Sequence, residues 1–264
     1  MRLALWILTA WVLMAMIGQL PLLEPNQIAL PAILQPPSST HWLGTDDLGR
    51  EIVDRLFAGA GVSLLVAAVS VTLSAAIGIL VGLVAGYYGG WLDRLISRVI
   101  EIFLAFPGML LAIAMAAMIG PGLDNVIIAL SVMGWVGYAR LVRVQVLALR
   151  RREHVLAAVA LGQPGQTIMW RHLLPLVMAP VWVEASFGIA AAVVAEAGLS
   201  FLGLGIQPPE ASWGAMIRDG VRYLLVAPHL VLAPGISLFL VVVAANLLGD
   251  GLRDRLDVTS RSTR

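Results

Sequence analysis

The sequence predicts an all-α membrane protein with six transmembrane helices, on the strength of its composition and its hydropathy pattern. Of the 264 residues, 59% are hydrophobic and only 12% are charged, and the mean hydropathy is +0.90. A typical soluble domain carries roughly 25% charged residues, and a soluble core of this length has no room for so much apolar surface. Six apolar stretches are each near or above the ~20 residues that cross a bilayer.

The six predicted spans follow one another along the whole chain. The first has an alternative interpretation as a cleaved signal peptide, but it is long for one and no clear small-residue cleavage site follows it. We therefore expect a retained helix. Prolines 107 and 234 favour kinks in the third and sixth spans. In chain order the spans are Leu3–Leu20, Val62–Tyr88, Ile102–Ile119, Asn125–Leu147, Leu176–Leu199 and Leu230–Leu248.

The second span carries glycines at every fourth position, which lie nearly on one face of a helix. Such a strip allows the backbone of a neighbouring helix to approach closely. Static helix packing is the favoured interpretation of the strip, ahead of a moving contact. The glycines are Gly78, Gly82, Gly86 and Gly90.

The arginines predict the topology. With a cytoplasmic N-terminus, 13 of the 17 arginines lie inside and 4 lie outside, and the opposite orientation reverses this ratio against the positive-inside bias. Both termini are therefore predicted to be cytoplasmic. The predicted organisation is a first transmembrane helix plus outer loop (1–61), a five-helix core (62–257) with a cytoplasmic loop at 150–175, and a cytoplasmic tail (258–264). The end of the outer loop, 49–61, is expected to form a short amphipathic helix.

Several kinds of chemistry are excluded or made remote by composition. All 17 basic residues are arginine, so the chain lacks the lysine that a P-loop or a Schiff base requires. It has no cysteine, and its four histidines lie in separate segments, so we expect no metal site and no cofactor in this chain. A net charge of +1 gives no field for nucleic acid. We expect a protein that is not an enzyme.

The loop at 150–175 predicts a helix–turn–helix along the membrane surface. Residues 153–161 favour a helix, Gly162 can end it in a left-handed conformation, and Pro164-Gly165 enforces the break. The small residues Ala157 and Ala158 allow another surface to approach closely. A helix this short needs a protein partner or lipid headgroups to cover its apolar side, and either remains open at this point.

Five segments resemble the C-type permease of the dipeptide, oligopeptide and nickel family of ABC importers. The loop matches the spacing of the EAA loop of such permeases, with Leu-Ala-Ala at 156–158, Gly162 and Leu-Pro at 174–175. The other segments resemble the family's LGTDxxGRD, FP, SFLGLGxQPPxxxWG and NLxGDGLRD motifs, and they lie at 41–51, 106–107, 196–214 and 246–254.

This resemblance implies the MetI-like ABC permease core and a specific division of work. It implies a heterodimer with a B-type permease, two cytoplasmic ATPase subunits that hold ATP and Mg²⁺, an extracytoplasmic substrate-binding protein and a bacterial inner (plasma) membrane. The loop would couple ATPase closure to movement of the spans. The implied coupling residues are Leu156, Ala157, Ala158, Gly162, His172, Leu174 and Pro175.

The chain departs from the family pattern at the first coupling position, because Leu156 stands where the EAA loop has glutamate. This removes any ion pair of that glutamate. Gly162→Pro or Ala157→Arg is predicted to uncouple transport by misplacing or blocking the helix.

Two acidic residues lie within the fifth span, where an acidic side chain costs about 2.5–3.5 kcal/mol on insertion scales. Glu184 and Glu196 are therefore expected to face the bundle interior or the translocation path. They are 12 residues apart, about 18 Å along a helix, so they form no carboxylate pair. Glu196 is interpreted mainly as a structural residue near the outer gate. For Glu184, contact with a cationic cargo and a local ion pair remain equal alternatives.

Peptides are the predicted cargo, and nickel or a metal–chelator complex is the alternative within the family. A free-standing channel or ion-coupled transporter is the alternative from another class. Such a protein has no need of a small-residue helix–turn–helix, so association with an ATPase distinguishes the two classes.

Overall fold

The computed structural model describes residues 1–261, and within them the chain is helical and has one isolated β-bridge, between Thr45 and Glu51. The last three residues of the predicted tail lie outside the described residues. The helices, with the 3-10 segment η1 and the π-helical segment η2, are α1 (Arg2–Ile17), η1 (Leu30–Ala32), α2 (Ile52–Tyr88), α3 (Gly90–Leu104), α4 (Gly108–Ile119), α5 (Leu123–Leu149), α6 (Glu153–Ala160), α7 (Gly165–Thr167), η2 (Ile168–Leu173), α8 (Leu174–Phe201), α9 (Trp213–Val221) and α10 (His229–Arg261).

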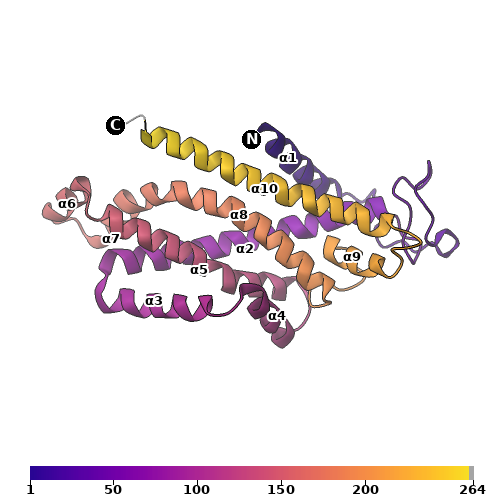
Figure 1. Ribbon diagram of the computed structural model, residues 1–264, viewed down its shortest axis with the longest axis horizontal. Helices are drawn as coiled ribbons and strands as arrows, with labels where there is room; N and C mark the ends of the chain where they lie inside the picture. The colour runs from indigo at the N-terminus through magenta and orange to yellow at the C-terminus, as the bar shows by residue number, and fades with distance from the viewer. Residues whose placement is uncertain (262–264) are drawn as a thin grey trace.

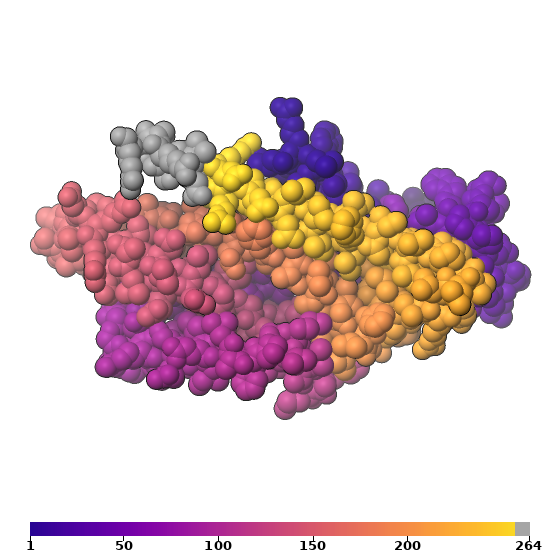
Figure 2. Space-filling view, viewed as in Figure 1, coloured from indigo at the N-terminus to yellow at the C-terminus, as the bar shows by residue number. Residues whose placement is uncertain are grey.

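The long helices lie along one axis of an elongated bundle (Figure 1). The segment α6–α7 lies at one end, which we call the α6 end, and the loop between α1 and α2 lies with α9 at the other, the α9 end (Figure 1). The space-filling view shows α6 and α7 projecting at the α6 end, beyond the body of the bundle (Figure 2). The chain therefore presents two structurally different ends on either side of its apolar middle.

Four helical segments are long and apolar enough to cross a membrane, namely Ile52–Tyr88, Leu123–Leu149, Gly165–Phe201 and His229–Leu256. A fifth is possible if α3 and α4, which meet at an angle of 85°, form one broken span. The apolar helix α1 has 16 residues, about 24 Å at 1.5 Å per residue, which is shorter than ~30 Å of hydrocarbon. The all-helical prediction is confirmed, with four or five helices of spanning length.

Two predicted elements differ from the structure. The stretch 49–61 is not a separate helix, because α2 runs unbroken for 37 residues from Ile52. Glycine is needed at position 59 of this helix, because a Cβ there would lie 2.9 Å from Trp213 Cδ1. The third span is broken rather than kinked, because Phe106 precedes a proline and is excluded from helical geometry, and Pro107 caps α4 instead.

The glycine strip of α2 forms the tightest seam of the bundle, against α5. A Cβ on Gly78 would lie 2.4 Å from Tyr138 Cβ, and one on Gly82 would lie 2.7 Å from the Ala139 carbonyl oxygen. Only glycine permits this approach, where close van der Waals contact holds two helices together. The predicted packing face is confirmed at Gly78, Gly82 and Gly86. Gly90 begins α3 and has open space around it, so it lies outside the strip.

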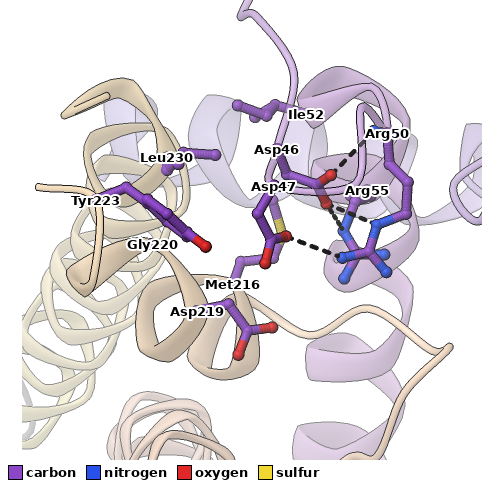
Figure 3. Close-up of a pocket in the computed structure, with 10 residues that line it drawn as sticks. All are labelled: Asp46, Asp47, Arg50, Ile52, Arg55, Met216, Asp219, Gly220, Tyr223 and Leu230. Atoms are coloured by element: carbon purple, nitrogen blue, oxygen red, sulfur yellow. Dashed lines mark hydrogen bonds and ion pairs between the residues drawn. The ribbon is translucent and has the colours of Figure 1, made fainter. Parts of the chain in front are cut away.

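A polar network fixes the loop before α2 to the α9 end. The Asp46 carboxylate lies between two buried arginines, with Oδ2 2.7 Å from Arg50 Nε and 3.5 Å from Arg55 Nε (Figure 3). Arg55 Nη1 also donates to the Pro25 carbonyl oxygen at 3.2 Å. Asp219 of α9 faces this group from the opposite side of a small pocket (Figure 3). The network ties a loop with little regular structure to the rigid start of α2.

Candidate functional site

The helix α6 has one buried and one exposed apolar side. Val155 and Ala158 are three residues apart on one face and are 1% and 3% exposed, packed in a cluster with residues of α2, α5 and α8. Leu156, Ala157 and Val159 point away from the bundle, and Leu156 and Val159 are more than half exposed. An apolar surface on a short helix at the tip of the molecule is a contact face without a partner in this chain.

The turn after α6 has the geometry that its sequence predicts. Gly162 has φ +74°, and its N–H donates to the Val159 carbonyl oxygen at 2.9 Å. The next N–H, that of Gln163, donates to the Ala158 carbonyl oxygen at 3.1 Å, so the last carbonyls of the helix are satisfied. A left-handed residue at this place favours glycine. The turn holds α6 at a defined angle to the following helix.

The second half of the hairpin anchors α6 to the bundle. His172 Nε2 hydrogen bonds to Gln163 Oε1 at 3.0 Å, which joins η2 to the turn. Gly165 lies against the ring of Tyr87, at the end of α2. Leu173 is buried, Leu174 is half-buried and Pro175 lies in the first turn of α8. We call residues 153–173 the α6 hairpin.

The platform beneath the α6 hairpin is held by arginines of α5 and the turn after it. Arg150 Nη1 donates to the carbonyl oxygens of Gly86 and Tyr87, at 3.1 and 3.3 Å, and so caps the C-terminus of α2. Arg143 pairs with Asp93 of α3 through both carboxylate oxygens, with Nη2 2.9 Å from Oδ2. These contacts fix the ends of α2, α3 and α5 to one another beneath the hairpin.

A large, open cavity of about 810 Å³ lies between α2, α4, α5, α8 and α10. Its walls are mostly small and apolar. The polar side chains that line it are Ser70, Ser74, Tyr138, Glu184 and Asn246. The Tyr138 hydroxyl is buried and makes no hydrogen bond within the described residues. A spacious cavity with few polar groups is typical of a binding or passage site.

A second, small cavity of about 520 Å³ lies between α5, α8 and α10 towards the α6 end. Glu184 and Phe187 line both cavities, so these two residues of α8 separate them. Arg253 of α10 and Gln145 of α5 also line the small cavity. Glu184 thus lies on the wall of both cavities, which its sequence position alone did not specify.

Glu196 has a different environment. It is fully buried, and its two carboxylate oxygens accept hydrogen bonds from Ser200 Oγ at 2.8 Å and Ser63 Oγ at 3.1 Å. Near it, the fully buried Trp213 donates from Nε1 to the Leu56 carbonyl oxygen at 3.0 Å. Among the described residues Glu184 lines the cavities, whereas Glu196 joins α8 to α2.

Sequence reasoning missed several residues that the fold brings to these places. Ser63 and Glu196 are 133 positions apart, so no local pattern predicts their contact. Asn246 and Arg253 lie in a segment singled out for its resemblance at 246–254, and that was their only signal. Within the described residues, no group of three or more histidine, aspartate or glutamate side chains has an arrangement that suits a metal ion.

The fold and the cavities define a class of protein, a helical membrane protein with cavities between its helices and an exposed hairpin at one end. Residues 78–261 match the family model described as the binding-protein-dependent transport system inner membrane component. The chain belongs to this family, and it is a permease subunit of an ABC importer and a multi-pass protein of the bacterial inner membrane. The family is the membrane component of importers in which ATPase, a further permease and a binding protein are separate subunits.

Two relatives illustrate the similarity. The chain is 44% identical over 259 residues to a dipeptide transport system permease protein, DppC, of Alkalihalophilus pseudofirmus, covering 97% of this chain and 84% of that protein. It is 46% identical over 221 residues to a glutathione transport system permease protein, GsiD, of Escherichia coli, covering 84% of this chain and 73% of that protein.

A solved structure of similar fold is that of the MetNI methionine ABC transporter in inward-facing conformations. The TM-score is 0.62 at 21% identity, with 75% of this chain and 95% of that chain covered. At this identity the likeness shows the fold alone, and it confirms the MetI-like permease architecture.

Proposed function

We propose that this permease subunit forms half of the translocation path for short peptides in an ATP-driven importer. Its partners would be a B-type permease, two cytoplasmic ATPase subunits that bind ATP and Mg²⁺, and an extracytoplasmic binding protein. The relatives named for dipeptide and glutathione transport support peptides as the cargo. The observation that supports action by separate ATPase subunits is the exposed apolar face of α6, whose opposite face is packed against the bundle.

The proposed coupling contact consists of the exposed side of the α6 hairpin. Leu156 and Ala157 would lie in a groove of the ATPase, and Ala158 would hold α6 to the bundle. Gly162, His172, Leu174 and Pro175 would keep the hairpin rigid, so that closure of the ATPase dimer displaces α6 as one body and tilts α8. Because Leu156 replaces a glutamate, this contact is more apolar than the family pattern implies.

The proposed topology has six spans, with α1 as the first, the bent pair α3–α4 as one broken span, and both termini in the cytoplasm. The α6 end is then cytoplasmic and the α9 end external. The chain has no cysteine, so single-cysteine variants test this directly. Leu161 at the α6 end is 80% exposed and Leu225 at the α9 end is 98% exposed. In intact cells, an impermeant maleimide should label Leu225→Cys and leave Leu161→Cys unlabelled; the reverse pattern contradicts the topology.

Transport by the reconstituted importer tests the function. The complete set of subunits in proteoliposomes should accumulate a radiolabelled dipeptide only with ATP and the binding protein. Liposomes that contain this chain and the B-type permease without the ATPases serve as the control and should show no uptake. Uptake without ATPase would instead identify a channel or secondary transporter, and uptake of nickel without peptide would identify the metal importer of the same family.

A further inference from the structure

The small cavity carries one negative and one positive side chain among its lining residues. Glu184 comes from α8 and Arg253 from α10, and the rest of the described lining is uncharged. Among the ion pairs of the part of the chain that the structure describes, none joins Glu184 to Arg253. Glu184 is half-buried and Arg253 is exposed, and two opposite charges in one cavity are complementary to a ligand that carries both charges.

The two charges lie at a similar depth. The helices α8 and α10 run in opposite directions along the bundle (Figure 1), and they meet where a Cβ on Gly249 would lie 2.9 Å from Phe187 Cε1. From this contact, Glu184 is three residues and about 4.5 Å towards the α6 end, and Arg253 is four residues and about 6 Å in the same direction. Glu184 and Arg253 therefore lie at a similar depth along the bundle, on two different helices that line the cavity.

The size and the remaining lining fit a short peptide. A volume of about 520 Å³ lies in the range of roughly 300–1,000 Å³ that is typical of small-molecule sites. An extended dipeptide spans about 7 Å from one end to the other. The Gln145 amide can hydrogen bond to a peptide group, and Leu141, Val183 and Phe187 offer apolar surface to side chains.

We infer that the small cavity is a binding site for zwitterionic short peptides, with Glu184 holding the free α-amino group and Arg253 the free α-carboxylate. This rests on the proposed function and adds the recognition of both peptide termini by the permease itself. The guanidinium fork suits a carboxylate through two parallel N–H donors. At the α6 end of the path, such a site receives the peptide as it leaves the large cavity past Phe187.

Binding to the assembled complex without nucleotide and without the binding protein tests this site. The complex of both permeases and the ATPases is placed in nanodiscs, and binding of radiolabelled dialanine is measured by equilibrium dialysis. Competition by unlabelled dialanine, N-acetyl-dialanine and dialanine amide is then compared. We expect each blocked peptide to compete about tenfold less well than free dialanine, because each lacks one charge.

Two variants assign the two ends. In Glu184→Gln, dialanine should bind about tenfold less tightly and the discrimination against N-acetyl-dialanine should disappear, while that against the amide remains. In Arg253→Gln the discrimination against the amide should disappear instead. The exposed ion pair Arg98–Glu101 on α3 offers matched controls, since Arg98→Gln and Glu101→Gln remove the same charges away from the cavity and should change neither preference.

The outcomes separate this inference from the proposed function. Co-purification of the subunits reports whether the neutral variants assemble. If they do not, Glu184→Asp and Arg253→Lys take their place; these variants keep the charges and should keep both preferences. Three results would overturn the inference. They are absence of dialanine binding to the wild-type complex, equal competition by all three peptides, and an equal effect of both variants on the binding of all three peptides. ATP-dependent dipeptide uptake by the same complex would then still support the proposed function.

Discussion

The α9 end and the α6 end of the bundle differ in the polar groups that they bury. At the α9 end, the ionisable groups Asp46, Arg55 and Glu196 are buried and have partners within this chain. Apolar side chains are exposed at both ends, since Leu161 at the α6 end is 80% exposed and Leu225 at the α9 end is 98% exposed. Buried charges are costly without partners, whereas exposed apolar faces mark contacts with other molecules. The α9 end is therefore stabilised by buried polar contacts within this chain, and each end also presents apolar surface that other molecules can cover.

The largest expected effect is at the buried carboxylate of the α9 end. Glu196→Ala removes the acceptor of two serine hydroxyls and leaves a cavity between α2 and α8, so we expect unfolding in mixed micelles to require about 3–5 kcal/mol less free energy. Glu184→Ala is the matched control, because Glu184 lines open cavities, and it should cost less than about 1 kcal/mol. Equal losses in the two variants would contradict the different environments of these glutamates.

A smaller loss is expected in the network of Figure 3. Asp46→Ala leaves Arg50 and Arg55 buried without the carboxylate that lies between them, and should lower the free energy of unfolding by about 2–3 kcal/mol. Asp47→Ala is the control, because that side chain is 32% exposed and lies 3.7 Å from Arg50, and an exposed pair contributes about 0–1 kcal/mol. Chemical denaturation of both variants measures the difference, and a larger loss for Asp47 would contradict the assignment.

The two ends also differ in what the sequence predicted. The features of the α6 end are local, since the helix at 153–161, its break at Gly162 and the glycine strip of α2 all follow from spacing within a single segment. The partners at the α9 end join segments that are distant in sequence, such as Ser63 and Glu196. The bend between α3 and α4 lies between these cases. Pro107 predicted a kink at the right place, whereas packing determines that the helix is broken there, at an angle of 85°. Local sequence patterns predicted the helices, whereas only the tertiary fold brings Glu184 and Arg253 to the same cavity.

Two adjacent alanines test whether the α6 end is made for a partner. Ala157 is exposed and Ala158 is 3% exposed against the bundle. Ala157→Arg should leave the free energy of unfolding within about 0.5 kcal/mol of wild type and yet reduce ATP-driven uptake at least about tenfold, because the side chain blocks the proposed groove. Ala158→Arg should destabilise the α6 hairpin itself, measured as faster proteolysis at 153–173.

Co-purification with the ATPases and normal uptake by Ala157→Arg would show that the exposed face of α6 is not the coupling contact. The same uptake assay on Ala158→Arg provides the comparison, since a loss there without a loss at Ala157 would mean that only the fold of the hairpin matters.

The smallest effect is expected from restoring the family's acidic residue at the exposed face. Leu156 is 53% exposed, so Leu156→Glu exchanges an apolar surface for a charged one without disturbing the bundle, and the free energy of unfolding should change by less than about 0.5 kcal/mol. If the ATPase groove of this system has evolved to receive leucine, the variant should associate a few-fold more weakly with the ATPases, and surface plasmon resonance on immobilised nanodiscs measures this. A few-fold tighter association would instead show that the groove keeps a basic residue for the missing carboxylate. Either sign locates Leu156 in the contact, whereas an unchanged affinity would place the contact elsewhere on the α6 end.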